Sequence, residues 1–107
     1  MTNFDDRIVN SIMLASKYPS IKRVGIFGSY AKGNYDKSSD IDLLYDYDET
    51  QENSTEDILN YVEEIDELLK KTANVTRVDY VWFKGVLNSN NQEFIQNVLR
   101  DIIWIYQ

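Results

Sequence analysis

The sequence predicts an α+β fold, in which helices pack against a small mixed β-sheet. Short runs rich in β-branched residues, typical of strands, alternate with longer segments whose apolar residues recur every three or four positions, typical of helices. The predicted order is helix, strand, strand, helix, strand, helix, which favours a mixed sheet covered by helices. With 107 residues, 43% of them hydrophobic, we expect a single domain over residues 1–107 with one core.

One helix and two strands are expected in the first half of the chain. A helix over about 5–18 is indicated by apolar residues at helical spacing, followed by the only proline, Pro19. These apolar residues are Ile8, Ile12 and Ala15. The β-branched run 23–27 ends at Gly28, which is typical of a buried strand that enters a turn, and the run DIDLLYDY predicts a second strand over 40–47.

A long helix and a third strand are expected next. Ser54 and Asp57 have the spacing of a capping box, and apolar residues then recur in steps of three and four, which predicts a helix over about 55–71. These apolar residues are Ile58, Val62, Ile65 and Leu69. The apolar and aromatic run VTRVDYVWF predicts the third strand over 75–83.

The C-terminal segment is expected to be a helix followed by a short apolar end. The run NQEFIQNVLRDI predicts a helix over 91–102, and residues 104–106 are expected to form a short strand or an apolar tail. The run 102–106 is more apolar than an exposed tail should be. We therefore interpret it as buried core or as a docking surface, with core favoured.

Composition excludes several classes of function. The chain has no cysteine and no histidine, so it lacks disulfides, thiolate nucleophiles and the commonest general base, and carboxylates are its only strong metal ligands. Its net charge is −7, from 18 acidic and 11 basic residues, so we expect no direct binding to nucleic acid. An acidic N-terminus and the lack of an apolar run of roughly 20 residues argue against a signal peptide and a membrane span. We expect a cytoplasmic protein.

Asp40 and Asp42 form a pair of anions on one face of the second predicted strand. Alternate side chains of a strand point to opposite faces, so Ile41 and Leu43 are expected to face the core instead. If the two carboxylates lie about 4 Å apart, their repulsion is about 4 kcal/mol at an effective dielectric near 20. Such a pair favours a bound cation, and hard oxygen ligands suit Mg²⁺ or Mn²⁺.

Asp79 is the third candidate ligand, because an aspartate within an apolar strand needs a partner or a solvated cleft. If its strand pairs beside that of Asp42, three carboxylates converge and could hold two divalent ions roughly 3.5–4 Å apart. Two simpler interpretations stay open. An Asp-x-Asp pair is often a solvated strand face or a turn cap, and Asp79 could form a structural salt bridge with Arg77 or Lys84.

The Gly28-Ser29 turn is a candidate phosphate site. Gly28 allows close approach of the backbone to a ligand, Ser29 offers a hydroxyl donor, and Lys32 adds a positive charge near the same turn. The P-loop pattern is excluded, because Asn34 stands where that motif needs its lysine. Taken alone, a Gly-Ser after a strand is usually just a turn.

Taken together, these features identify a resemblance. A strand that ends in Gly-Ser, ten intervening residues, Asp-x-Asp on the next strand and a later strand aspartate resemble the nucleotidyltransferase superfamily typified by DNA polymerase beta. The short chain, the GSYAKG form and the closing FIQNVLRDIIWIYQ resemble the minimal nucleotidyltransferases, or MNT proteins, that are encoded beside HEPN-domain toxins. The resemblance extends from about Val24 to Tyr106 and implies a polymerase beta-like fold.

The resemblance also implies roles for individual residues. Gly28 and Ser29 would hold the terminal phosphates of the nucleotide, and Asp40 and Asp42 would bind the metal pair. Asp79 would complete the catalytic metal site and help to activate a hydroxyl group. That hydroxyl would attack the α-phosphorus of a nucleoside triphosphate, and pyrophosphate would leave.

The family further implies a substrate and a partner. Its antitoxin members transfer AMP from ATP to a tyrosine of a HEPN ribonuclease toxin, so we expect ATP, two Mg²⁺ or Mn²⁺ ions and a hetero-oligomer with such a toxin. Lys32 departs from the arginine that the family often has, and it lacks the bidentate fork of arginine. Two alternatives remain, a non-catalytic antitoxin that masks its toxin by contact and an adenylyltransferase for a small molecule.

Overall fold

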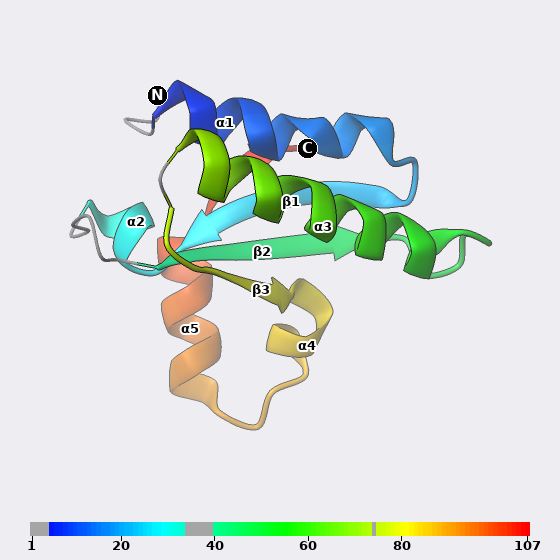
Figure 1. Cartoon of the computed structure of the whole chain (residues 1–107). Helices are drawn as coiled ribbons and strands as arrows, with labels where there is room; N and C mark the ends of the chain where they lie inside the picture. The colour runs from blue at the N-terminus through cyan, green and yellow to red at the C-terminus, as the bar shows by residue number, and fades with distance from the viewer. Residues whose placement is uncertain (1–4, 34–39, 74) are drawn as a thin grey trace.

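The computed structural model describes residues 5–33, 40–73 and 75–107, and its centre is a four-stranded sheet in the order β3-β2-β1-β4 (Figure 1). The strands are β1 (Ile21–Phe27), β2 (Ile41–Tyr47), β3 (Val78–Trp82) and β4 (Ile103–Tyr106). Strand β1 runs antiparallel to both β2 and β4, whereas β3 runs parallel to β2. The sheet is therefore mixed, as the sequence predicts.

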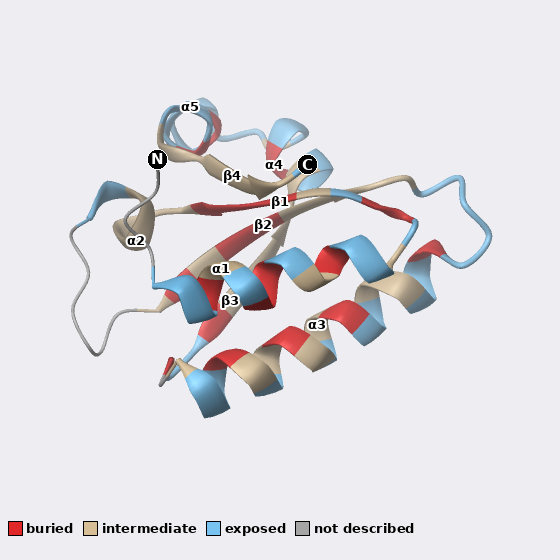
Figure 2. Cartoon of the chain, turned by 90° about the horizontal axis from the view of Figure 1, so that it is seen from above, coloured by how far each residue is buried: buried red, intermediate tan, exposed pale blue. Residues whose placement is uncertain are grey.

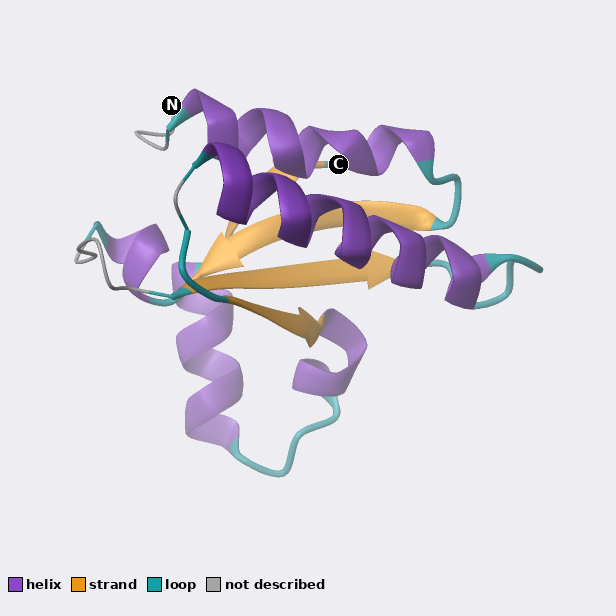
Figure 3. Ribbon diagram, in the orientation of Figure 1, coloured by secondary structure: helices purple, strands orange, loops and turns teal. Residues whose placement is uncertain are grey.

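Helices cover both faces of this sheet (Figures 2 and 3). The helices are α1 (Asp6–Ile12), which continues as the 3-10 helix η1 (Met13–Lys17), α2 (Ser29–Lys32), α3 (Ser54–Thr72), α4 (Phe83–Leu87) and α5 (Gln92–Asp101). The pair α1 and α3 lies along one face, and α4 and α5 lie on the other. The short α2 follows directly after β1 at the edge where β2 begins.

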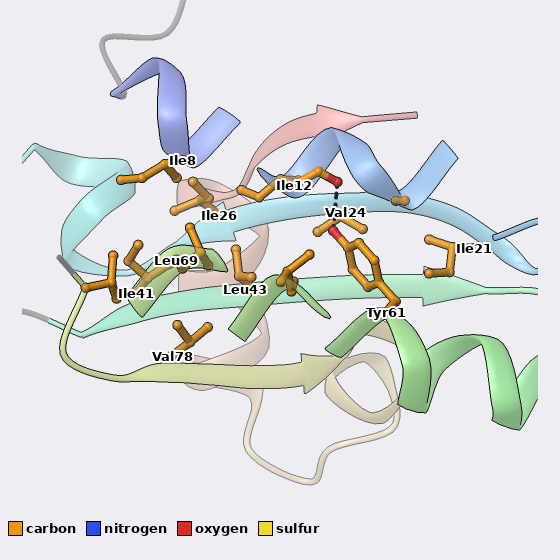
Figure 4. Close-up of a cluster of buried hydrophobic side chains, with 13 residues drawn as sticks. Ile8, Ile12, Ile21, Val24, Ile26, Ile41, Leu43, Tyr61, Leu69 and Val78 are labelled. Carbon is orange, nitrogen blue, oxygen red and sulfur yellow. Dashed lines mark hydrogen bonds between the residues drawn. The ribbon is translucent and has the colours of Figure 1, made fainter. Parts of the chain in front are cut away.

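The main core lies between the sheet and the helices α1 and α3 (Figure 4). Its buried side chains come from both helices and from β1, β2 and β3, and they include Ile12, Ile26, Leu43, Tyr61, Ile65 and Leu69. The hydroxyl of Tyr61 lies within this cluster, and it donates a hydrogen bond of 2.8 Å to the carbonyl oxygen of Ile12. The buried hydroxyl of Tyr61 therefore has a hydrogen-bond partner, as buried polar groups generally do.

A second, smaller core lies under α4 and α5 on the opposite face of the sheet. It consists of Leu44, Val86, Ile95 and Val98, with Phe27, Val81, Phe83, Ile102 and Trp104 packed against it. Consecutive residues of β2 therefore enter different cores, since Leu43 belongs to the main core and Leu44 to this one. Both faces of β2 are therefore buried at this point.

Most predicted elements are confirmed, with two exceptions. The predicted strand 75–83 is shorter: it begins only at Val78 and ends at Trp82, where α4 follows, and no pattern in the sequence had indicated this helix. The capping box is wrong: the N-cap of α3 is Asn53, without a capping side chain, and the carboxylate of Asp57 accepts a hydrogen bond of 3.1 Å from the backbone N–H of Ser20 instead.

The apolar end of the chain forms strand β4, which pairs with the edge of β1. Its residues are partly buried and pack against both cores, Trp104 against the smaller one and Ile105 and Tyr106 against the main one, so this run lies at the periphery of the core. None of the helices described in the structure combines the length and the apolar character needed to cross a membrane.

Candidate active site

Asp42 and Asp79 occupy paired positions on the parallel strands β2 and β3. Paired residues of neighbouring strands point to the same face, and that face is opposite the one on which Ile41 and Leu43 enter the main core. Asp40 precedes β2 and lies two residues before Asp42, which extends the acidic group along the same face. The structure thus places the three predicted aspartates on one face of the sheet, at the edge where β2 and β3 begin.

The electrostatics of Asp42 reflect this arrangement. Partial burial raises the pKa of the Asp42 carboxyl, and the nearby charges of Asp79 and Asp40 raise it further. Asp79 also shares a hydrogen bond with Asp42 that acts in the same direction. The positive charge of Arg77 opposes these effects and lowers the same pKa. Three like charges at one strand edge therefore destabilise the ionised form of the central carboxylate.

Arg77 is the cation that lies among these carboxylates. Its Nη2 is 3.1 Å from Oδ1 of Asp79, and its Nε is 3.9 Å from Oδ2 of Asp40. The salt bridge between Arg77 and Asp79 that the sequence left as an alternative is confirmed. Lys84, the other partner considered there, instead forms an ion pair with Glu49.

The three aspartates supply ligands of the type that a hard divalent cation prefers, although they are not arranged as a metal-binding group. All three side chains supply oxygen atoms, which Mg²⁺ and Mn²⁺ prefer. Within residues 5–33, 40–73 and 75–107, however, no three acidic side chains are already arranged as a ligand group for a metal ion. A bound cation would offset the repulsion among these anions.

Gly28 lies against the central carboxylate. Strand β1 ends with Phe27, whose partner in the sheet is Asp42, so the following turn passes directly beside that aspartate. Gly28 has a φ of 73° and a ψ of −147°, a conformation that only glycine adopts readily. A β-carbon at this position would lie 2.4 Å from Oδ2 of Asp42. Ser29 follows at once, so the predicted Gly-Ser turn lies beside Asp42.

Lys32 makes a contact that the sequence did not indicate. Its Nζ lies 3.4 Å from Oδ2 of Asp101, which also pairs with Arg100 at the end of α5. Lys32 is still about half exposed and belongs to the helix that begins at Ser29. The contact links α2 to α5, two segments far apart in sequence, and no local pattern could reveal it. Asn34, on which the exclusion of a P-loop depends, lies outside the described residues.

The sequence matches a known family over most of its length. Residues 10–107 match the sequence model of the family described as polymerase beta, nucleotidyltransferase. The protein adenylyltransferase MntA of Thermococcus cleftensis is 29% identical over 102 residues, which cover 91% of this chain and 92% of that protein.

Solved structures give the same result for the fold. A structure described as a candidate minimal nucleotidyltransferase is 27% identical and has a TM-score of 0.65, with 96% of this chain and 98% of that chain covered. One chain of a toxin–antitoxin complex with AMP-PNP has a TM-score of 0.60 at 22% identity, with 92% of this chain and 72% of that chain covered. The second likeness concerns the fold.

Proposed function

The chain belongs to the polymerase beta nucleotidyltransferase family, and from this premise we propose that it transfers AMP from ATP to a hydroxyl group of a partner protein. The observation that carries the proposal is the pairing of Asp42 with Asp79 beside the Gly28 turn. A triphosphate with bound divalent cations requires two things of its site. Carboxylates bind the cations, and a glycine turn lets the backbone approach the phosphates closely.

The proposed reaction is a nucleotidyl transfer. The oxygen of the acceptor hydroxyl forms a bond to the α-phosphorus, and the bond from that phosphorus to the bridging oxygen of the β-phosphate breaks, so pyrophosphate leaves. The proton of the hydroxyl passes to the carboxylate of Asp79. Gly28 and Ser29 hold the terminal phosphates, and Asp42 and Asp40 orient the reacting end of the triphosphate.

We assign the divalent ions to Asp40, Asp42 and Asp79. Bound Mg²⁺ or Mn²⁺ would neutralise phosphate charge and favour the ionised form of the acceptor hydroxyl. Asp42 fits this task because partial burial and the nearby charges of Asp79 and Asp40 raise its pKa, which destabilises its charged form when no cation is bound. We expect two ions, as the sequence resemblance implies.

A protein acceptor is supported by the name of a relative, the adenylyltransferase MntA. We propose that the acceptor here is a tyrosine of a HEPN ribonuclease toxin and that the transfer makes this chain its antitoxin. The fold that this chain shares with a member of a toxin–antitoxin complex is consistent with that assignment. A chain with a net charge of −7 is also better suited to a protein partner than to a polynucleotide.

The test is transfer of label from ATP that carries ³²P at the α-phosphate. The acceptor in this experiment is the protein encoded in the adjacent reading frame, purified separately and mixed with this chain and Mg²⁺. We expect label on that protein with the natural sequence and none with Asp42→Ala. Label that persists with Asp42→Ala would show that the assigned carboxylates are not the site.

A second candidate function is an antitoxin that masks its toxin by contact alone. The ion pairs of Arg77 with Asp79 and Asp40 favour it, because they give these two carboxylates a cationic partner other than a metal ion. In that case the double variant Asp40→Ala, Asp42→Ala would still neutralise the toxin in cells. Loss of neutralisation with a stable complex would favour the enzyme.

A further inference from the structure

Arg77 is held beside the acidic group by the backbone as well as by charge. The carbonyl oxygen of Arg77 accepts a hydrogen bond of 3.1 Å from the backbone N–H of Ile41, so the start of β3 is fixed against the start of β2. Arg77 directly precedes β3, and its ion pair with Asp79 shows that both side chains reach the same place. The backbone position of Arg77 therefore keeps its guanidinium close to the carboxylates, without contacts from a distant element.

The guanidinium makes contacts at both ends of the acidic group. Nη2 and Nε lie 3.1 and 3.2 Å from Oδ1 of Asp79, while Nε is 3.9 Å from Oδ2 of Asp40. Lys32, the other cation expected here, pairs with Asp101. Arg77 is also the group whose charge favours ionisation of Asp42, which carries no ion pair of its own among those of the described residues.

We propose that Arg77 is a built-in competitor for the metal site, a cation that neutralises the carboxylates in the metal-free protein and must leave them when a divalent ion binds. This inference rests on the proposed assignment of the metal ligands. It goes beyond that assignment because it gives a role to a residue outside the ligand set, as the group that sets the affinity for metal.

The exposure of Arg77 makes this exchange feasible. Its side chain is 68% exposed, and those of Asp40 and Asp79 are 40% and 38% exposed. Ion pairs with such access to water contribute little to stability, so the guanidinium can leave without disturbing the fold. Because it remains attached at the start of β3, it stays next to the site after release.

The experiment measures binding of Mn²⁺ alone, without nucleotide or partner, from the signal of free Mn²⁺ in electron paramagnetic resonance. Arg77→Gln keeps a long polar side chain but removes the charge. We expect this variant to bind Mn²⁺ about five- to tenfold more tightly than the natural protein. Lys84→Gln removes a charge from another exposed ion pair, with Glu49, and should change the dissociation constant by less than about twofold.

Each outcome separates this inference from the proposed function. If Asp42→Ala abolishes Mn²⁺ binding but Arg77→Gln does not tighten it, the competitor role is wrong and the metal site stands. Equal tightening by Lys84→Gln also overturns the competitor role, because overall charge would then be the cause. Failure of the natural protein and of Arg77→Gln to bind Mn²⁺ would overturn the metal site and this inference together.

A measurement on the natural protein makes the test independent of the variants. In a sample uniformly labelled with ¹⁵N, the Nε–H signal of Arg77 reports its hydrogen bond to Asp79. Titration with Mg²⁺ should shift this signal with the same dissociation constant as the signals of Asp42. If the signals of Asp42 shift and that of Arg77 Nε–H does not, Arg77 is not displaced.

Discussion

A β-carbon on Gly28 would lie 2.4 Å from Oδ2 of Asp42, so the turn after β1 and the first carboxylate of β2 compete for the same space. No side chain can occupy position 28 while Asp42 keeps its place, because real β-carbons do not approach an oxygen so closely. The φ of 73° adds a second reason for glycine. The carboxylate and the turn thus depend on each other.

Gly28→Ala is therefore expected to reduce both the stability and the activity of the protein. The strained backbone should lower the free energy of unfolding by roughly 1–3 kcal/mol, and displacement of the Asp42 carboxylate should abolish AMP transfer and weaken Mn²⁺ binding. Urea unfolding and the label-transfer reaction measure the two effects separately. Gly33→Ala is the matched control, since Gly33 has a φ of 77° but a β-carbon there would meet no atom of the described residues within 4 Å. If Gly33→Ala loses transfer to the same extent, contact with Asp42 is not the cause.

Asp42→Asn should stabilise the metal-free protein at neutral pH. Burial and the charges of Asp79 and Asp40 raise the pKa of Asp42 in the folded state, so its negative charge opposes folding once the pH exceeds the unfolded pKa. We expect a higher urea midpoint for Asp42→Asn at pH 7 in the presence of EDTA, and no gain at a pH low enough to protonate Asp42 in both states.

Asp48 provides a control, because Asp→Asn at this position should change stability in the opposite direction. Hydrogen bonds from the side chain and backbone of Thr50 lower the pKa of Asp48, so its ionised form favours the folded state above the unfolded pKa and the benefit is lost as the pH falls. Asp48→Asn should consequently lower the midpoint at pH 7. A lower midpoint for Asp42→Asn as well would mean that Arg77 outweighs burial and repulsion at Asp42.

Lys32 can be tested for a role in nucleotide binding against a purely structural one. Its ion pair with Asp101 is partly exposed, so the loss of that pair should change the free energy of unfolding by less than about 1 kcal/mol. If Lys32 binds phosphate, Lys32→Ala should raise the KM for ATP several-fold, whereas Asp101→Asn, which frees the same lysine, should not. Equal effects of both variants on KM would assign Lys32 to the α2–α5 contact alone.

The sequence predicted those features of the acidic site that depend on neighbouring residues in the chain. Alternation along one strand places Asp40 and Asp42 on one face, and the glycine before Ser29 marks the turn. The position of Asp79 was conditional, because only the pairing of β2 with β3 brings it beside Asp42. That pairing depends on packing of both strands against α3, and a helix separates them in the sequence.

Contacts between distant segments explain what the sequence did not predict. Asp57 has the spacing of a helix cap, but its carboxylate accepts a hydrogen bond from the backbone N–H of Ser20 instead. Ser20 is buried and far from Asp57 in the sequence. Phe83 continues an aromatic run and yet begins α4, because it packs onto the second core rather than extending β3. In both cases tertiary packing outweighs the local pattern.

The core can be tested independently of the site at Tyr61, whose hydroxyl donates to the carbonyl oxygen of Ile12 over 2.8 Å in the main core. Tyr61 is 1% exposed, so Tyr61→Phe leaves that carbonyl oxygen without this donor, and we expect a loss of about 1–2 kcal/mol in the free energy of unfolding by urea titration. Tyr80→Phe is the control. The hydroxyl of Tyr80 donates to Asp66 in a partly buried position, where water can replace it, so its loss should be smaller. Both tyrosines lie on the face away from Asp42, so AMP transfer should persist in both variants, and its loss in Tyr61→Phe would show that the main core controls the site.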